Sequence, residues 1–204
     1  MNWRAVEMTA SQVRMNQPGM QLSLNGNAQG DASDLARATL QAHGIEHALI
    51  DTGETTLLGV GPDASPWAFG IEPAAMLPQR AQSDTARTMP SKDGLLQMSP
   101  PVAISDGRAM ATSSDAHTVF SPDHRHHHIL NPRTGYSPQY WSSVTVIAPS
   151  CVLADALTKV FFMLSPSRVQ PAARYWGVDV VLQDKKGRWL PTLAGQAIIA
   201  RGNQ

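Results

Sequence analysis

The chain has 204 residues, of which 42% are hydrophobic and 16% are charged, and its 16 Lys and Arg side chains balance its 16 Asp and Glu side chains. This length can bury one substantial core, and the balanced charge gives no sign of a nucleic-acid binding surface. No apolar run reaches the roughly 18 residues of a membrane-spanning helix, and the N-terminus shows no signal-peptide pattern. We therefore expect one domain over residues 1–204, cytoplasmic in the chain as given.

Strand and helix patterns alternate through the first hundred residues. A loop with two glycines at 22–30 leads into an alanine-rich helix at 34–43, which Gly44 ends. Strands are predicted at 46–51, 55–60 and 67–72. Residues 74–100 are rich in proline, methionine and polar side chains, so we predict a loop-rich insertion there.

The second half of the chain repeats this alternation. Short strands are predicted at 102–105, 108–112, 118–121, 127–130 and 143–148. Helices are predicted at 150–164 and 167–176, followed by a hairpin of 178–182 with 188–191 and a tail over 193–204. The apolar stripe of the first helix predicts core packing by Val152, Leu153, Ala156, Leu157, Val160, Phe161 and Leu164.

The most informative motif is His-Arg-His-His-His-Ile-Leu-Asn-Pro-Arg-Thr-Gly at 124–135. Proline fixes one backbone angle of the turn and glycine permits the reversal, so an imidazole, an amide and the Thr134 hydroxyl would be held together. Such a turn suits a polar ligand; a plain turn or a surface metal site of histidines is the alternative. We expect one functional histidine, His128, with solvent-facing neighbours, and His127 on the opposite face of the strand from it.

Two further segments carry candidate chemistry. In Leu-Ser-Leu-Asn-Gly-Asn-Ala-Gln-Gly at 22–30, glycines allow a ligand close to the backbone, and the following helix start offers N–H groups to an anion. An ordinary strand-to-helix connection is the alternative.

In the 150–164 helix, Asp155, Thr158 and Lys159 share one face, where carboxylate and hydroxyl oxygens suit Mg²⁺ on a phosphate. A solvated Asp–Lys pair is the alternative.

The one cysteine, Cys151, lies at the start of that helix and excludes an internal disulfide. A helix dipole could lower the pKa of its thiol, but a small buried apolar residue is the role we expect.

Together these three segments resemble the FAD:protein FMN transferases, the ApbE-type flavin transferases. Collinear matches at 48–54, 67–73 and 111–115 extend the resemblance over roughly residues 4–182. It implies an α+β fold of mixed or antiparallel sheets with packed helices, T-fold-like and without the family's N-terminal segment. Loss of that segment would expose apolar surface, which favours self-association.

The resemblance also implies an activity. FMN would pass from FAD to a threonine or serine hydroxyl of an acceptor flavoprotein, AMP would leave, and Mg²⁺ would bridge the diphosphate. His128 would activate the acceptor hydroxyl. Contacts to the nucleotide would come from Ser23, Asn25, Gln29, Ile129 and Thr134. The metal-ligand positions would be Gly26, Asp155, Thr158 and Lys159. Members of the family are commonly periplasmic or membrane-anchored.

Three residues depart from the family pattern. Lys159 replaces a metal-binding threonine, Asn27 an apolar residue and Asp31 an aromatic one. An ammonium cannot ligate a cation, and its repulsion would cost roughly 1–4 kcal/mol. Lys159 would have to turn away or contact the phosphate directly. These departures keep two other functions open: a flavin-binding scaffold that has lost transfer, and hydrolysis of FAD to FMN and AMP.

Overall fold

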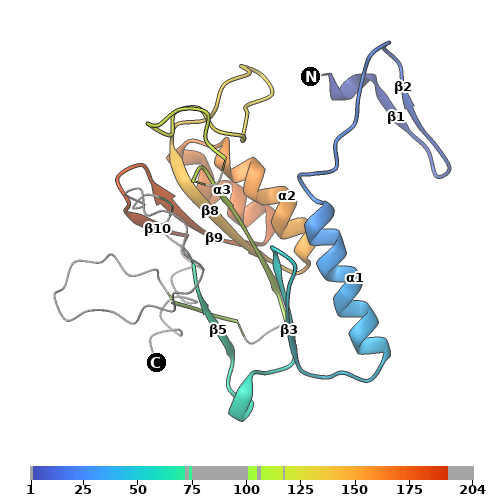
Figure 1. The fold of residues 1–204 in the computed structure, drawn as a ribbon, viewed down its shortest axis with the longest axis vertical. Coiled ribbons are helices and arrows are strands. Elements are labelled where there is room, and N and C mark those ends of the chain that lie inside the picture. Colours follow the sequence, from blue (N-terminus) through green and yellow to red (C-terminus); the bar gives the residue numbers. More distant parts are fainter. Residues whose placement is uncertain (1, 72–73, 75–100, 105–106, 117, 193–204) are drawn as a thin grey trace.

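The computed structural model describes residues 2–71, 74, 101–104, 107–116 and 118–192. Their centre is a sheet with the strand order β10-β9-β8-β7-β4-β3 (Figure 1). Its strands are β3 (Ala48–Asp51), β4 (Thr55–Leu58), β7 (Ala109–Ser114), β8 (Trp141–Ala148), β9 (Asp179–Asp184) and β10 (Trp189–Pro191). Every neighbouring pair in this sheet is antiparallel. The predicted α+β class with antiparallel sheets is confirmed.

Two strand pairs lie outside the central sheet. They are β1 (Val6–Met8) with β2 (Val13–Met15), and β5 (Trp67–Gly70) with β6 (Pro101–Ile104). Short 3-10 turns, η1 (Trp3–Ala5) and η2 (Pro62–Ala64), precede β1 and β5. The β1–β2 hairpin stands away from the sheet at the end of an extended stretch of chain (Figure 1). Three of its apolar side chains are exposed: Met8 at 77%, Val13 at 54% and Met15 at 42%.

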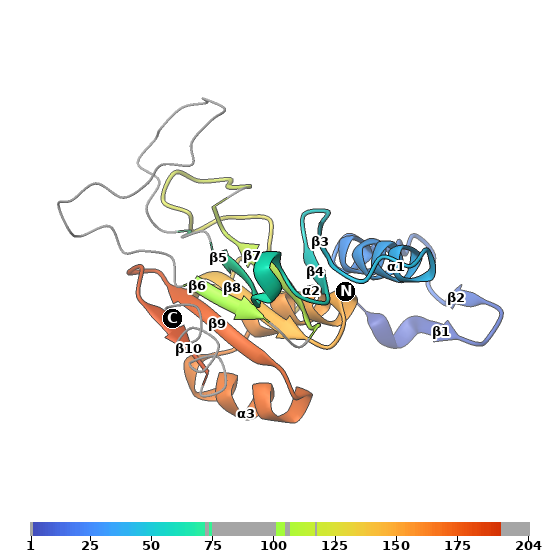
Figure 2. The same ribbon diagram turned by 90° about the horizontal axis from the view of Figure 1, so that it is seen from below.

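The helices are α1 (Ala28–Ala42), α2 (Cys151–Phe162) and α3 (Pro166–Trp176). α2 packs on β7 and β8, and α1 packs on α2 (Figure 2). Successive side chains of a strand point to opposite faces of a sheet. Val144 and Val146 of β8 therefore join the helices in one apolar cluster, whereas Ile147 joins a second cluster on the other face. Every residue of β8 is consequently buried, and the sheet is a rigid base for the loops at its edge.

Several predicted elements differ from the structure. The strands expected at 118–121 and 127–130 reduce to a single bridge between Val119 and His127, because the His127 N–H and carbonyl bond to the Ser137 hydroxyl instead of to a neighbouring strand. The helix expected from residue 34 begins at Ala28, so Gly30 is helical. The loop-rich insertion was expected at 74–100, and of it only Ala74 is among the described residues. The tail expected at 193–204 lies outside them. No helix in the described ranges is long and apolar enough to cross a membrane.

Candidate functional site

A cavity of about 570 Å³ lies where the start of α1, strand β7, the 128–132 turn and α2 meet. Segments from three distant parts of the sequence thus share one space, whose size suits a small-molecule ligand. The described lining residues include six of the predicted site residues: Asn25, Gly26, Gln29, His128, Ile129 and Lys159. Asp155 and Thr158, which are 1% and 0% exposed, are buried beside Lys159.

Two predicted ligand contacts do not line this cavity. Ser23 is exposed, and its Oγ accepts the Asn25 N–H at 3.4 Å. Thr134 is also exposed, and its Oγ1 accepts the Tyr136 N–H at 3.3 Å. Both hydroxyls therefore serve the turns in which they lie.

The starts of α1 and α2 are tied together by carboxylates. The Gly30 N–H in the first turn of α1 donates to Asp155 Oδ2 at 3.2 Å. In return, the N–H groups of Cys151 and Val152 donate to Asp34 Oδ1 and Oδ2 at 2.8 and 2.9 Å. A carboxylate is favourable at a helix N-terminus because the N–H groups there have no partner within the helix. Each helix thus supplies the acceptor that the other needs.

Gly30 is also required by the contact between these helices. A Cβ at this position would lie 2.6 Å from the Cys151 carbonyl oxygen and 2.7 Å from the Val152 Cα. Such a separation is not tolerated between packed atoms. The glycine that the sequence suggested for close approach of a ligand is therefore used for close approach of α2.

Asp155, Thr158 and Lys159 share one face of α2, as their spacing predicts. The Lys159 ammonium pairs with Asp155 Oδ1 and donates to the Asp155 carbonyl oxygen at 3.0 Å. The Thr158 hydroxyl donates to the same carbonyl at 2.7 Å and lies 2.7 Å from Ser113 Oγ. The Asp–Lys pair does form, but its carboxylate is buried, so it is not a solvated surface pair.

As they lie, these residues do not fit a divalent metal ion. One Asp155 oxygen accepts the Gly30 N–H and the other holds the Lys159 ammonium. An ammonium has no lone pair to offer a metal, and its charge repels one. Among the residues that the structure describes, no group of three His, Cys, Asp or Glu side chains could hold a metal ion.

His128 is exposed at the mouth of the cavity. Its ring Nδ1 lies 3.4 Å from the Thr118 carbonyl oxygen. Because a carbonyl only accepts, this contact favours the tautomer with the ring proton on Nδ1, in which Nε2 is the nitrogen that can accept a proton. The turn after His128 has the predicted form: the Gly135 N–H donates to the Asn131 carbonyl at 2.8 Å, and Gly135 has φ +75°. Only glycine adopts that angle without strain.

The expectation that the neighbours of His128 face solvent is wrong for His127, which is 0% exposed. The Ser137 hydroxyl accepts the His127 N–H at 2.9 Å and donates to its carbonyl at 2.8 Å. The ring packs on Phe162 with centroids 5.6 Å apart. Burial lowers the pKa of His127, which favours the neutral ring. His127 thus anchors the turn that carries His128.

Glu54 is a cavity residue that sequence reasoning did not single out. It is 7% exposed, and its Oε2 accepts the Thr112 N–H at 3.1 Å. Burial, followed by the nearby Asp155 carboxylate, raises the pKa of Glu54 to about 7. Its position in the 48–54 segment, which matches the family pattern, was the feature of the sequence that could have pointed to this residue. Ser113 lies just beyond the strand predicted at 108–112, whereas in the structure it belongs to β7 and lines the cavity.

The expected role of Cys151 is borne out. The residue is fully buried, and burial raises the pKa of its thiol to about 12. The lowering of that pKa by the helix dipole, the other interpretation, is wrong because desolvation of the thiolate dominates at this site.

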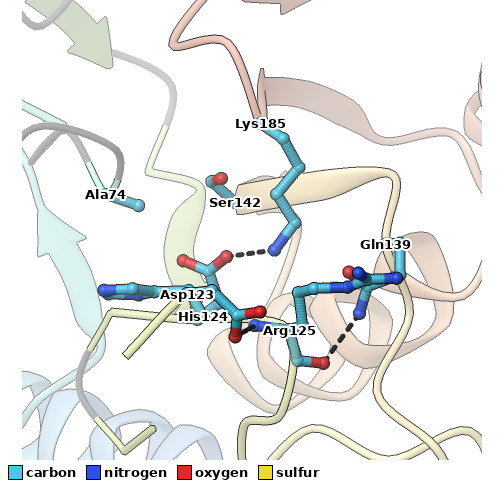
Figure 3. A pocket seen from close by; sticks show the side chains of 8 residues that line it. Ala74, Asp123, His124, Arg125, Gln139, Ser142 and Lys185 are labelled. Carbon is cyan, nitrogen blue, oxygen red and sulfur yellow. Dashed lines mark hydrogen bonds and ion pairs between the residues drawn. The ribbon is translucent and has the colours of Figure 1, made fainter. Parts of the chain in front are cut away.

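A second cavity of about 520 Å³ lies beside the 123–125 loop (Figure 3). Lys185, in the turn between β9 and β10, reaches into it and pairs with the buried Asp115 carboxylate. The Arg125 carbonyl accepts from Gln139 Nε2 at 2.8 Å. None of the predicted site residues is among its described lining residues, and the first cavity is therefore the candidate site.

Known proteins resemble this chain in sequence and in structure. A family model described as the ApbE family matches residues 1–182. The FAD:protein FMN transferase of Vibrio cholerae is 30% identical over 169 residues, which are 81% of this chain and 45% of that protein. The FAD:protein FMN transferase of Rhodobacter capsulatus is 27% identical over 86% of this chain and 30% of its own length. The chain thus spans less than half the length of these curated relatives.

Solved structures share the fold. The crystal structure of the ApbE protein from Thermotoga maritima aligns with a TM-score of 0.76 at 23% identity, covering 96% of this chain and 59% of that one. The flavin transferase ApbE from Vibrio cholerae aligns with a TM-score of 0.74 at 22% identity, covering 96% and 58%. From the match of its first 182 residues to the family model, the chain belongs to the ApbE family.

Proposed function

We propose that this chain carries the site of an FAD:protein FMN transferase, which moves FMN from FAD to a threonine or serine hydroxyl of a target flavoprotein and releases AMP. The observation that carries the proposal is the shared cavity of the α1 start, the His128 turn and α2. The names of the curated relatives, FAD:protein FMN transferase, support the transfer of FMN from FAD to a protein. Since the chain spans under half of those relatives, the activity is a proposal for this chain.

The chemistry follows from the cavity's own side chains. The acceptor oxygen attacks the phosphorus of the FMN half, the bond from that phosphorus to the bridging oxygen breaks, and AMP takes the bridging oxygen. His128 Nε2 receives the proton of the acceptor hydroxyl. Asn25 and Gln29 contact the nucleotide through side-chain amides and Ile129 through its backbone. Ser23 and Thr134 are proposed as outer contacts, because their hydroxyls are engaged in local turns.

The Mg²⁺ ion that the resemblance implies stays a prediction. By the resemblance its ligand positions would be the Gly26 carbonyl, Asp155, Thr158 and Lys159, but the Lys159 ammonium cannot ligate a cation. When bound, such an ion neutralises charge on a diphosphate. The Lys159 ammonium already pairs with Asp155 Oδ1, and no part of the chemistry above depends on the metal.

The same pair favours a second function, a flavin-binding scaffold that has lost transfer. A buried carboxylate that is neutralised by a lysine does not need a metal for its own stability. A scaffold would bind FAD in the same cavity and leave it intact.

One incubation separates these functions. The full chain is mixed with FAD and an acceptor peptide of the family's Asp-Gly-x-Thr type, with MgCl2 or with EDTA, and the products are resolved by mass spectrometry. Covalent flavin on the peptide together with AMP supports transfer. Intact bound FAD supports the scaffold. Free FMN with AMP indicates hydrolysis, and absence of FAD binding refutes all of these functions.

Self-association is a separate part of the proposal. The apolar side chains of Trp3, Met8 and Val13 are 74%, 77% and 54% exposed. Exposed apolar surface of this kind favours contact with a second copy. Analytical ultracentrifugation over a range of protein concentrations checks it, and a monomer throughout would contradict it.

A further inference from the structure

The starting point is the position of the Lys159 ammonium. It lies one helical turn after Asp155 and pairs with a carboxylate that is almost completely buried, while about a third of the Lys159 side chain remains accessible. Lys159 is also one of the residues that line the cavity. The Asp155 carboxylate therefore fixes the position of the Lys159 ammonium, whose accessible part can contact a ligand in the cavity.

The charges around the cavity favour a cation at this position. Glu54 lines the cavity, and the buried Asp155 carboxylate is paired with Lys159. The diphosphate of a flavin dinucleotide adds about two further negative charges at neutral pH. Lys159 is the one lysine or arginine among the described lining residues. Without a cation, the carboxylates would repel the diphosphate.

The hydrogen bonds show how the Lys159 ammonium can bind a phosphate group. A lysine has three N–H donors. Two of them are directed at the Oδ1 and the carbonyl oxygen of Asp155. The third is available to a phosphate oxygen, and a charge-assisted hydrogen bond of this type is among the stronger ones in proteins.

The oxygens that a metal ion would need are taken. Asp155 Oδ2 accepts the Gly30 N–H, and Asp155 Oδ1 is paired with the Lys159 ammonium. A divalent ion at Asp155 would have to displace the ammonium and then remain beside it.

We propose that the Lys159 ammonium replaces a divalent metal ion as the counter-charge of the flavin diphosphate, so that this chain binds FAD independently of Mg²⁺. This inference rests on the proposed function, because it takes FAD as the ligand of the cavity. A monovalent ammonium neutralises less charge than Mg²⁺, and the chain would hold the dinucleotide by hydrogen bonding to the phosphate instead of by ligation.

The test is the affinity of the full chain for FAD, measured by isothermal titration calorimetry in EDTA and in excess MgCl2. For the unmodified chain, we expect the two dissociation constants to agree within about threefold. Lys159→Met should weaken binding in EDTA by roughly ten- to a hundredfold, the worth of a hydrogen bond to a charged group. Lys159→Thr should weaken FAD binding similarly in EDTA, and the affinity for FAD should recover when MgCl2 is added.

Lys186→Met is the matched control, since Lys186 is exposed in the turn between β9 and β10; it should bind FAD like the unmodified chain. Circular dichroism checks that each variant is folded. The comparison of EDTA with MgCl2 on the unmodified chain needs no variant, so it tests the inference even if a variant fails to fold.

The outcomes separate this inference from the proposed function. FAD that binds the unmodified chain only with MgCl2, or binds Lys159→Met as tightly as the unmodified chain in EDTA, overturns the role of Lys159 and leaves the transferase proposal standing. A folded chain that binds no FAD in either buffer overturns both.

Discussion

Replacing Glu54 with glutamine should change how the stability of this protein depends on pH. Burial raises the pKa of Glu54 from 4.5 to about 7. Between these values the folded chain keeps a proton that the unfolded chain has lost, so the free energy of unfolding falls as the pH rises through this window. At about 1.4 kcal/mol for each pH unit, the loss by pH 8 is roughly 3 kcal/mol.

Glutamine stays neutral and keeps an oxygen for the Thr112 N–H. Glu54→Gln should therefore match the unmodified protein near pH 4.5 and exceed its stability by roughly 3 kcal/mol at pH 8. Urea denaturation without FAD, followed by circular dichroism at both pH values, measures this difference. Glu46→Gln, at an exposed position, is the control and should show no such dependence. A Glu54→Gln effect that is equal at both pH values would refute the role assigned to burial.

Three further predictions concern the turn and the helix contact. His128→Ala should lower flavin transfer by roughly a hundredfold or more, the usual worth of a general base, while calorimetry shows unchanged FAD binding; His126→Ala should transfer normally. Asp34→Ala should lower the free energy of unfolding by about 1–3 kcal/mol, because two N–H groups at the start of α2 lose their acceptor. Gly30→Ala should cost about 1–3 kcal/mol in urea denaturation, since its Cβ would meet the Cys151 carbonyl.

Each stability variant has a matched control. Asp31→Ala removes an exposed carboxylate from the same turn of α1 and should change stability by less than about 0.5 kcal/mol. Gly26→Ala places a Cβ where nothing lies within 4 Å. Equal losses in a variant and its control would show that the contacts named above do not carry the effect. Full transfer by His128→Ala would remove this histidine from the mechanism.

Local patterns in the sequence predicted the parts of the site that depend on near neighbours. The i, i+3, i+4 spacing put Asp155, Thr158 and Lys159 on one helical face, because the period of an α-helix is fixed by its backbone geometry. The Asn-Pro-Arg-Thr-Gly turn was also predictable, since proline and glycine restrict or free their own backbone angles. The Asp155–Lys159 pair could also be read from the i, i+4 spacing, but only the structure shows that its carboxylate is buried.

Local sequence patterns predicted most of the helices and strands of the central sheet, because hydrophobic period and turn residues act over a few positions. They did not predict that the strands expected at 118–121 and 127–130 would reduce to one bridge. The tertiary structure alone decided the burial of His127, the raised pKa of Glu54 and the capping of α2 by Asp34. Each of these depends on groups that lie far away along the chain. Asp34 is separated from Cys151 by 117 positions. Desolvation and charge act through space, so they are set only when the folded chain brings such groups together.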